Sequence, residues 1–349
     1  MPSPIVAKES FDAALLPGVR DQLAEAYRSL RQSEDKVFCS VLDQEGMFHD
    51  GIAHVRDCPL CRMSSQSATL LHSVHGMHIV RCTNCDFVYS REVINREVDD
   101  SRYRRSDAME AHMALHTNAT YAGLELAKAR YIVGNLQRSL SAESASLLDI
   151  GSSTGALLQA AREIGWHPLG IELNGRAVGI ARARGYEVIE GSFPSDLPSK
   201  TRVFEVITML DVLEHAEEPV EFLGLVTAHL RPGGLLAIQV PNFNSLLIQM
   251  EGTKNNNLCH GHWSYFTAET LRKVTARAGL QELSIETIIS EIDRIQAYPS
   301  DVVLETARSL TAQEITPAQL DHSWLHEHLL GYKLFGIFAT PQVQRKRAS

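Results

Sequence analysis

The sequence of 349 residues has no long hydrophobic run and no excess of positive charge. No stretch reaches the roughly 18 apolar residues of a membrane-spanning helix, and residues 1–10 contain no apolar segment of a secretion signal. The 33 lysines and arginines are outnumbered by 42 aspartates and glutamates, for a formal net charge of −9. This balance argues against general nucleic-acid binding, which uses basic surfaces to neutralise phosphates. We expect a cytoplasmic protein with no membrane or nucleic-acid partner, and nothing in the sequence indicates an oligomeric state.

Internal repeats and low-complexity tracts are also absent from the sequence. Hydrophobic residues make up 44% of the chain, which suffices for a sizeable core and excludes wholesale disorder. The length allows two domains, or one large domain with additions.

Four of the six cysteines form two closely spaced pairs, Cys58 with Cys61 and Cys82 with Cys85. In a chain without an export signal, this spacing indicates a metal site and not a pair of disulfides. Four thiolates on two turns suit a tetrahedral, structural Zn²⁺ ion. The alternative is that the four cysteines are unrelated buried residues.

The chain divides into four predicted regions. Residues 1–57 are a lead-in with a helical pattern at 17–31, residues 58–90 a small β module with the cysteines, and residues 91–145 a linker followed by covering helices at 107–116 and 121–140. From residue 146 to 349 strand and helix patterns alternate, which predicts an α/β fold with a parallel sheet. Within this last region, residues 297–330 are predicted to be added helices, before a final antiparallel strand at 332–339.

The glycine turn in residues 147–155 is the feature around which the last region is organised. It follows a predicted buried strand and precedes a helix, so its backbone N–H groups and the helix N-terminus can contact a ligand. A dinucleotide site would have glycine where Ser153 stands. The Asp149 carboxylate would repel a pyrophosphate, but it suits a ligand with a cationic amino acid end.

An acid, Glu172, ends the next predicted strand. At this position an acid accepts hydrogen bonds from the ribose hydroxyls of a nucleoside, whether the ligand is NAD or S-adenosylmethionine (SAM). The alternative is a glutamate that only caps the following helix.

These residues, together with two later segments, resemble the class I SAM-dependent methyltransferases. The later segments are the run Leu-Asp-Val-Leu-Glu-His-Ala-Glu-Glu-Pro at 210–219 and the turn Arg-Pro-Gly-Gly at 231–234. With the cysteine module, the resemblance covers about residues 58–280 and includes bacterial zinc-ribbon methyltransferases that act on sugars, glycans and natural products. It implies a doubly wound, Rossmann-like α/β sheet and an enzyme of the methyltransferase class.

The resemblance also implies a set of cofactor-binding residues. Ser153 replaces the middle glycine of the family, and Ser192 stands where the family commonly has an acid for the adenine amino group, so adenine recognition would rest on Ser192, backbone groups and Phe193. The residues implied to hold SAM are Asp149, Gly151, Ser153, Gly155, Glu172, Ser192, Phe193, Leu210 and Asp211.

Two histidines are candidates for a general base in the implied reaction. His215 follows the strand that ends at Leu210, and His262 lies in an aromatic-rich loop with Tyr265, so both can face the carboxyl edge of the sheet. His215 is preferred, with His262 as the second candidate; Tyr265 completes the predicted catalytic set. These residues could instead only pack against the cofactor or the core. A further alternative is that Asp211, Glu214, His215 and His262 gather a divalent ion.

The sequence therefore predicts a SAM-dependent methyltransferase with a small-molecule acceptor, a structural zinc ion and a histidine base. The acceptor class indicated by the resemblance is a sugar, glycan or natural-product intermediate. The alternatives are a non-catalytic scaffold that binds SAM or a partner protein, and an NAD-dependent oxidoreductase, which Asp149 and Ser153 disfavour.

Overall fold

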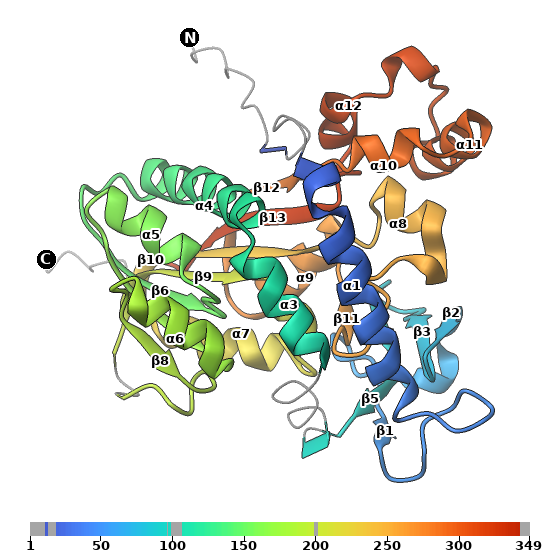
Figure 1. Cartoon of the computed structure of the whole chain (residues 1–349), viewed down its shortest axis with the longest axis horizontal. Helices are drawn as coiled ribbons and strands as arrows, with labels where there is room; N and C mark the ends of the chain where they lie inside the picture. The colour runs from blue at the N-terminus through green and yellow to red at the C-terminus, as the bar shows by residue number, and fades with distance from the viewer. Residues whose placement is uncertain (1–10, 13–18, 96, 99–106, 199–201, 343–349) are drawn as a thin grey trace, which may run out of the picture.

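The computed structural model describes residues 11–12, 19–95, 97–98, 107–198 and 202–342 (Figure 1). A central seven-stranded sheet is surrounded by helices, and a smaller sheet lies beside it at the end that carries the cysteines. Within the described residues, no helix combines the length and the apolar character of a membrane span.

The central sheet has the strand order β12-β13-β10-β9-β6-β7-β8. Strands β6 to β10 are parallel, whereas β13 runs antiparallel to both of its neighbours. The predicted doubly wound α/β sheet and its antiparallel last strand are thereby confirmed. The strands are β6 (Ser146–Ile150), β7 (His167–Glu172), β8 (Val188–Glu190), β9 (Phe204–Leu210), β10 (Leu230–Pro241), β12 (Gln281–Ile288) and β13 (Lys333–Ala339).

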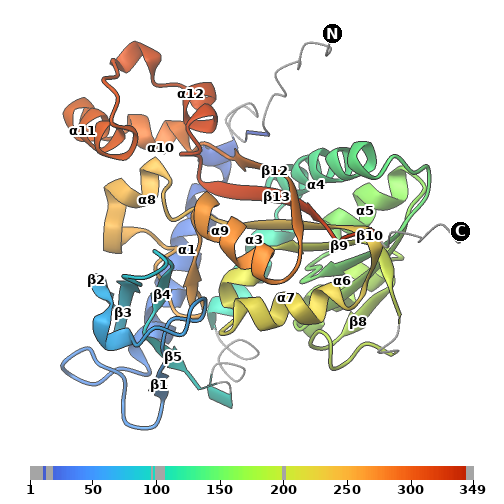
Figure 2. The ribbon, with the colours of Figure 1, turned by 180° about the vertical axis from the view of Figure 1, so that it is seen from behind.

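Helices cover both faces of this sheet because its strands are apolar on both sides. On one face, residues such as Leu147 and Val206 pack against α4 (Ala119–Leu140) and α5 (Ala156–Glu163). On the other, Leu148 and Ile207 pack against α7 (Pro219–Thr227) and α9 (Ala268–Arg277), which lie in front of the sheet in Figure 2. The remaining helix of the parallel units is α6 (Gly175–Ala183).

The sheet of the cysteine module includes a strand from much later in the chain. Its order is β11-β4-β3-β2, so β11, from residues 264–265, extends a sheet otherwise built from residues 69–90. Cys58, Phe87 and Tyr89 belong to the same hydrophobic cluster as Leu148 and Ile207 of the central sheet. The module therefore shares part of its core with the central sheet. Its strands are β2 (Thr69–Val74), β3 (Met77–Arg81), β4 (Val88–Ser90) and β11 (Ser264–Tyr265).

The regions before and after this module are more ordered than the sequence suggested. Residues 92–94, expected to begin a linker, form the buried strand β5 (Glu92–Ile94), which pairs with β1 (Ala53–Val55). The predicted N-terminal helix is present and longer, as α1 (Val19–Cys39), and packs beside α3 (Asp107–Thr117). The rest of the expected linker, at 96 and 99–106, lies outside the described residues.

Added helices form a second apolar cluster beyond β12 and β13. The expected helices between 297 and 330 are present, together with short ones that the sequence did not predict. The α-helices of this region are α8 (Leu246–Glu251), α10 (Ile292–Gln296), α11 (Ser300–Thr311) and α12 (His322–Glu327).

Short 3-10 turns occur in several parts of the chain, at η2 (Ser65–Ser67), η3 (Leu213–His215), η4 (Gly252–Lys254) and η5 (Pro317–Gln319).

Candidate functional site

One large cavity of about 1910 Å³ opens at the carboxyl ends of β6, β7, β8 and β9, with further walls from α1, α3 and α4. The strand order reverses at β6, between β7 and β9, which is where open α/β sheets bind ligands. Except for Gly155, every residue expected to hold the cofactor lines this cavity, and so do His215 and His262.

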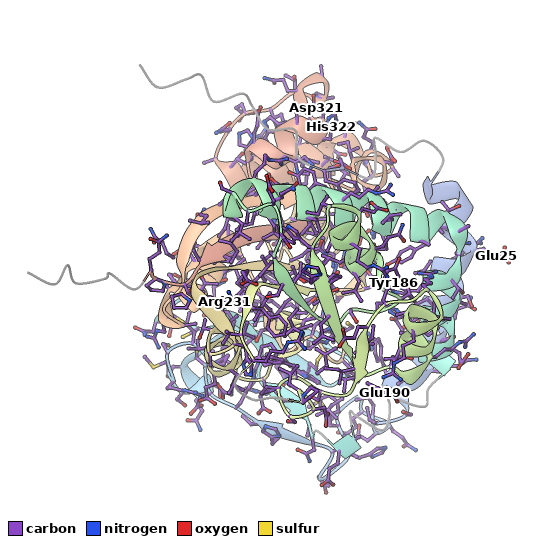
Figure 3. The ribbon with its side chains drawn as sticks, turned by 90° about the vertical axis from the view of Figure 1, so that its left-hand side faces the viewer. Glu25, Tyr186, Glu190, Arg231, Asp321 and His322 are labelled. Carbon is purple, nitrogen blue, oxygen red and sulfur yellow. The ribbon has the colours of Figure 1, made fainter. Side chains whose placement is uncertain are left out.

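The glycine turn after β6 depends on both of its glycines, for different reasons. Gly151 has φ +77°, and a Cβ atom there would lie 2.7 Å from a methyl carbon of Val212. Gly155 has φ +90°, and its Cβ would lie 2.8 Å from the ring of Tyr186, which Figure 3 labels. Gly151 therefore shapes the cavity wall, whereas Gly155 lets α5 pack closely and does not itself line the cavity.

The turn is tied to Glu172 at the end of β7. One carboxylate oxygen accepts a hydrogen bond from the backbone N–H of Ser153 at 2.9 Å, and the other accepts from Asn174 N–H at 2.8 Å. Burial raises the pKa of Glu172, against the effect of these hydrogen bonds. Because a carboxylate has about four acceptor positions, the two bonds orient Glu172 and leave capacity for ligand hydroxyl groups.

Asp149 lies deeper, at 3% exposure, and accepts a hydrogen bond of 2.6 Å from the Thr208 hydroxyl. Burial raises its pKa to about 7. A buried carboxyl with one neutral partner at the cavity wall is suited to pair with an incoming cationic group.

The segment after β8 forms a further part of the wall. Ser192 donates its backbone N–H to the Asp196 carboxylate at 2.7 Å. The Phe193 ring is 8% exposed and packs edge-on against Phe222, with 5.9 Å between centroids. Phe193 and Leu210 give this end of the cavity an apolar surface, and Ser192 places polar groups beside it.

Asp211 is held by a partly buried lysine, Lys333, that the sequence analysis did not identify. Its carboxylate accepts from Lys333 Nζ at 2.7 Å and from the Gln239 amide at 2.8 Å. Burial alone would raise the pKa of Asp211, but the nearby lysine charges and the bond from Lys333 lower it. Asp211 thus remains an anion paired with Lys333 of β13. This pairing could not be predicted from the sequence because the two residues are 122 positions apart.

The two predicted histidines lie side by side at the cavity wall. Their ring centroids are 4.9 Å apart at 76°, although they are far apart in the sequence. His215 Nδ1 lies 2.8 Å from the Gly261 carbonyl and His262 Nδ1 lies 3.0 Å from the Asn257 carbonyl. Since a carbonyl only accepts, each neutral ring carries its proton on Nδ1, which makes Nε2 the basic nitrogen.

Burial lowers the pKa of both histidines, that of His262 to about 3. Both rings are therefore neutral at pH 7. A neutral imidazole at a cavity wall can accept a proton from a bound molecule.

Tyr265 does not line the large cavity. It lies on β11 at 5% exposure, packs against Phe243 with 5.9 Å between ring centroids, and borders a small hollow of about 10 Å³ shared with Glu214 and His262. The structure thus brings His215 and His262 together and leaves Tyr265 in the packing behind them.

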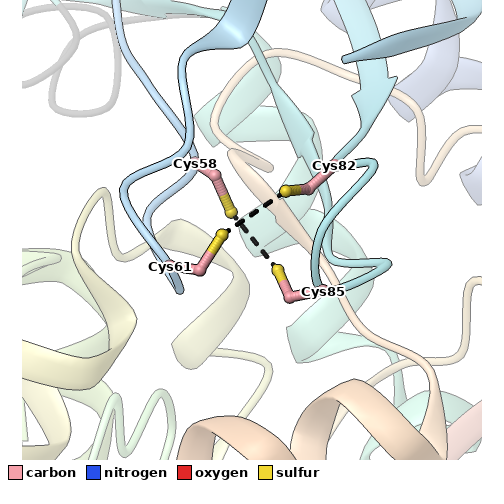
Figure 4. Close-up of side chains that lie close together, drawn as sticks. All are labelled: Cys58, Cys61, Cys82 and Cys85. Atoms are coloured by element: carbon pink, nitrogen blue, oxygen red, sulfur yellow. Dashed lines mark hydrogen bonds between the residues drawn. The ribbon is translucent and has the colours of Figure 1, made fainter. Parts of the chain in front are cut away.

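The four cysteines converge on one point, as Figure 4 shows. Cys58 Sγ lies 3.6 Å from Cys85 Sγ, and Cys61 Sγ lies 3.5 Å from Cys82 Sγ. These distances are too long for a disulfide bond. They are close to the S···S spacing of about 3.8 Å that a tetrahedral site with Zn–S bonds of about 2.3 Å requires, so the cysteines fit a zinc ion.

A buried arginine, Arg56, joins the cysteine module to both histidine-bearing segments. Its guanidinium donates to the backbone carbonyls of Glu217, after His215, and of Trp263, after His262, while its Nε donates to Ser90 O at 3.0 Å. Ser90 N–H also donates to Trp263 O at 2.9 Å, alongside the β4–β11 pairing. Burial lowers the pKa of Arg56 to about 10, so it remains charged at neutral pH.

Helix α3 contributes two further histidines to the cavity that sequence reasoning did not assign. The rings of His112 and His116 pack at a tilt of 42° with 4.3 Å between centroids, and His116 Nδ1 lies 3.2 Å from the Ser153 hydroxyl. Burial lowers the pKa of His116 to about 3. Their four-residue spacing on a helix predicted to cover the sheet was the signal that could have found them.

Comparison with known proteins finds one family model that matches the part of the chain with most of these residues. The family model described as "Methyltransferase domain" matches residues 125–285. The C-methyltransferase NovU of Streptomyces niveus is 25% identical over 250 residues, which are 69% of this chain and 54% of that protein. The ubiquinone biosynthesis O-methyltransferase of Paramagnetospirillum magneticum is 32% identical over 98 residues, 27% of this chain and 39% of its own.

The chain thus spans about half the length or less of these two curated relatives. A solved SAM-dependent methyltransferase from Archaeoglobus fulgidus aligns with 60% of this chain and 93% of its own, at 18% identity and a TM-score of 0.42. The fold assignment rests on the sheet order given above, and the family assignment on the match over residues 125–285. Residues 125–285 thus match a methyltransferase domain model, and they lie within an α/β fold with a mostly parallel central sheet.

Proposed function

We propose that this protein transfers a methyl group from SAM to a small-molecule acceptor, a sugar, glycan or natural-product intermediate, with a histidine as base. The observation that carries the proposal is one cavity with two kinds of wall. The Glu172 carboxylate and the Gly151 turn form a nucleoside-type cradle, and the neutral histidine pair lies in the same cavity. Similarity to proteins named as a C-methyltransferase and as O-methyltransferases supports the reaction class.

Each residue of the site has a role in this proposal that follows from its position in the cavity. Glu172 would accept the ribose hydroxyls, Asp149 would pair with the cationic amino acid end, and Ser192 and Phe193 would flank the adenine. Bound SAM supplies a methyl group activated by its sulfonium. At the acceptor end, His215 Nε2 would take the proton that the acceptor loses, with His262 as the alternative base or as a group that orients the acceptor.

The cysteine module has a structural role in this proposal. Four converging thiolates would leave a bound zinc ion no open position for chemistry. The ion would fix the two turns that precede β2 and β4, and through Arg56 and β11 it would hold the histidine segments.

Replacing Glu172 by alanine should weaken SAM binding by about 1–3 kcal/mol, about 5- to 150-fold in Kd, because ribose hydroxyls lose a charged acceptor. Isothermal titration calorimetry measures the change, and Glu187→Ala, at an exposed position just before β8 and away from the carboxyl ends of the strands, is the matched control. SAM binding by Glu172→Ala as tight as wild type would reject the ribose assignment. Tight binding of NAD in place of SAM would reject the proposed function.

His215→Asn should lower kcat by about 10²–10⁴ while SAM affinity stays nearly unchanged, the loss expected for a general base. Because burial lowers the pKa of His215, wild-type activity should fall only below pH ~6.5, and this acidic limb should change in the variant. Turnover of a panel of acceptors, measured as a function of pH, gives both kcat and the acidic limb of the profile. If SAM binding collapsed while kcat at saturating cofactor stayed normal, His215 would be a cofactor contact and His262 the base.

Protein purified without added zinc should contain about one Zn²⁺ ion per chain, as one four-thiolate site predicts. Elemental analysis gives the stoichiometry, and Cys61→Ser should reduce it whereas Cys39→Ser, at an exposed cysteine, should not. A metal-free, fully folded preparation in which all four thiols react with a thiol reagent would contradict the assignment.

A further inference from the structure

Glu214 is a buried carboxyl group with no hydrogen-bond partner among the described residues. It lies in the 3-10 turn η3 at 1% exposure, and neither side-chain oxygen is bonded. The group borders both the large cavity and the small hollow behind it. Unpaired buried carboxyls are rare because their desolvation is costly, so one at a site wall calls for a functional explanation.

The surroundings of Glu214 place it against the histidine pair. One carboxyl oxygen and one ring nitrogen each of His215 and His262 all lie within 4.8 Å of one another. The other ionisable groups around this cluster come from separate elements. They are Asp211 after β9, Lys333 on β13, Cys259 and Tyr265 beside His262, His112 on α3 and Lys128 on α4.

Two carboxyl groups in this cluster are in opposite states. Asp211 is paired with Lys333 and Gln239, so it stays ionised. Neither a cation nor an amide group donates a hydrogen bond to Glu214 among the described residues. Burial and the neighbouring Asp211 carboxylate raise the pKa of Glu214 well above its ordinary value, whereas the Lys333 charge lowers it. The resting cluster therefore consists of two neutral imidazoles and one protonated carboxyl.

We propose that Glu214 is the proton partner of the histidine pair: it ionises when an imidazole has taken a proton from the acceptor. The inference rests on the proposed methyl transfer. As the bond between acceptor and methyl forms and the sulfonium keeps the C–S electron pair, the acceptor proton goes to Nε2 of His215. Glu214 then releases its own proton to the cavity, which leaves a carboxylate beside the imidazolium. Return of one proton from imidazolium to carboxylate restores both groups.

Glu214→Gln tests this role because glutamine keeps the shape and the neutral state of the resting side chain. We expect SAM affinity and acceptor KM within about twofold of wild type and kcat lower by about 10- to 100-fold. Without a carboxylate to stabilise the imidazolium, the acidic limb of the kcat profile should move to lower pH by about one unit. The matched control is Glu221→Gln, on an exposed glutamate of α7 that pairs with Arg62.

A readout without turnover separates this proposal from the proposed function. Infrared spectra of the full-length protein at pH 7 should contain a protonated-carboxyl band that Glu214→Gln lacks and Glu221→Gln retains. Absence of that band overturns the role of Glu214, whether or not the protein methylates anything. So does an unchanged kcat and pH profile in a Glu214→Gln enzyme that turns over.

A metal titration gives the remaining outcome. Co²⁺ added to zinc-loaded protein should not bind at the cluster of Glu214, His215 and His262. A second ion per chain that is bound by wild type and lost in Glu214→Gln would make these residues a cation site and overturn the proton role.

Discussion

The contact on which the site depends most is the junction between Arg56 and two backbone carbonyls, those of Glu217 and Trp263. These carbonyls belong to separate segments, each of which carries one histidine of the cavity wall. A charged guanidinium buried at 7% exposure satisfies both, and Ser90 completes the connection from β4. Charge-assisted hydrogen bonds of this kind are strong and directional, so the histidine spacing is fixed from the cysteine module.

This junction explains why the small cysteine module accompanies the α/β sheet. The module contributes no residue from its cysteine turns to the large cavity, yet it shares a sheet with β11 and a hydrophobic cluster with the central strands. Its neighbours on α9 hold it from the other side, where Lys273 and Arg277 donate to carbonyls at Cys85 and Leu60. The Glu172 carboxylate and the Gly151 turn, by contrast, belong to the central sheet and its loops, with His116 of α3 beside Ser153.

Much of this arrangement could be predicted from local patterns, and the failures have a physical reason. The strand limits at Ser146–Ile150 and His167–Glu172, the cysteine cluster and the proximity of His215 and His262 follow from periodicity and from the shared edge of parallel strands. Long-range partners such as Lys333 and Arg56 could not be predicted, because pairing across more than a hundred residues leaves no local signal. Tyr265 is a case in which a local pattern was misleading. We expected this aromatic residue in the cavity because it is close to a predicted base in the sequence, but the pairing of β11 with β4 directs its side chain into the core.

Hydrogen–deuterium exchange on Arg56→Met would test most directly whether the module holds the histidine segment. We expect the amides at residues 263–266 to exchange at least about tenfold faster than in wild type, while those of β6 and β7 stay protected and SAM affinity holds. Arg277→Met, which removes a contact between the module and α9 but none to the histidine segments, should leave 263–266 protected. Unchanged protection at 263–266 in a folded Arg56→Met protein would contradict the account.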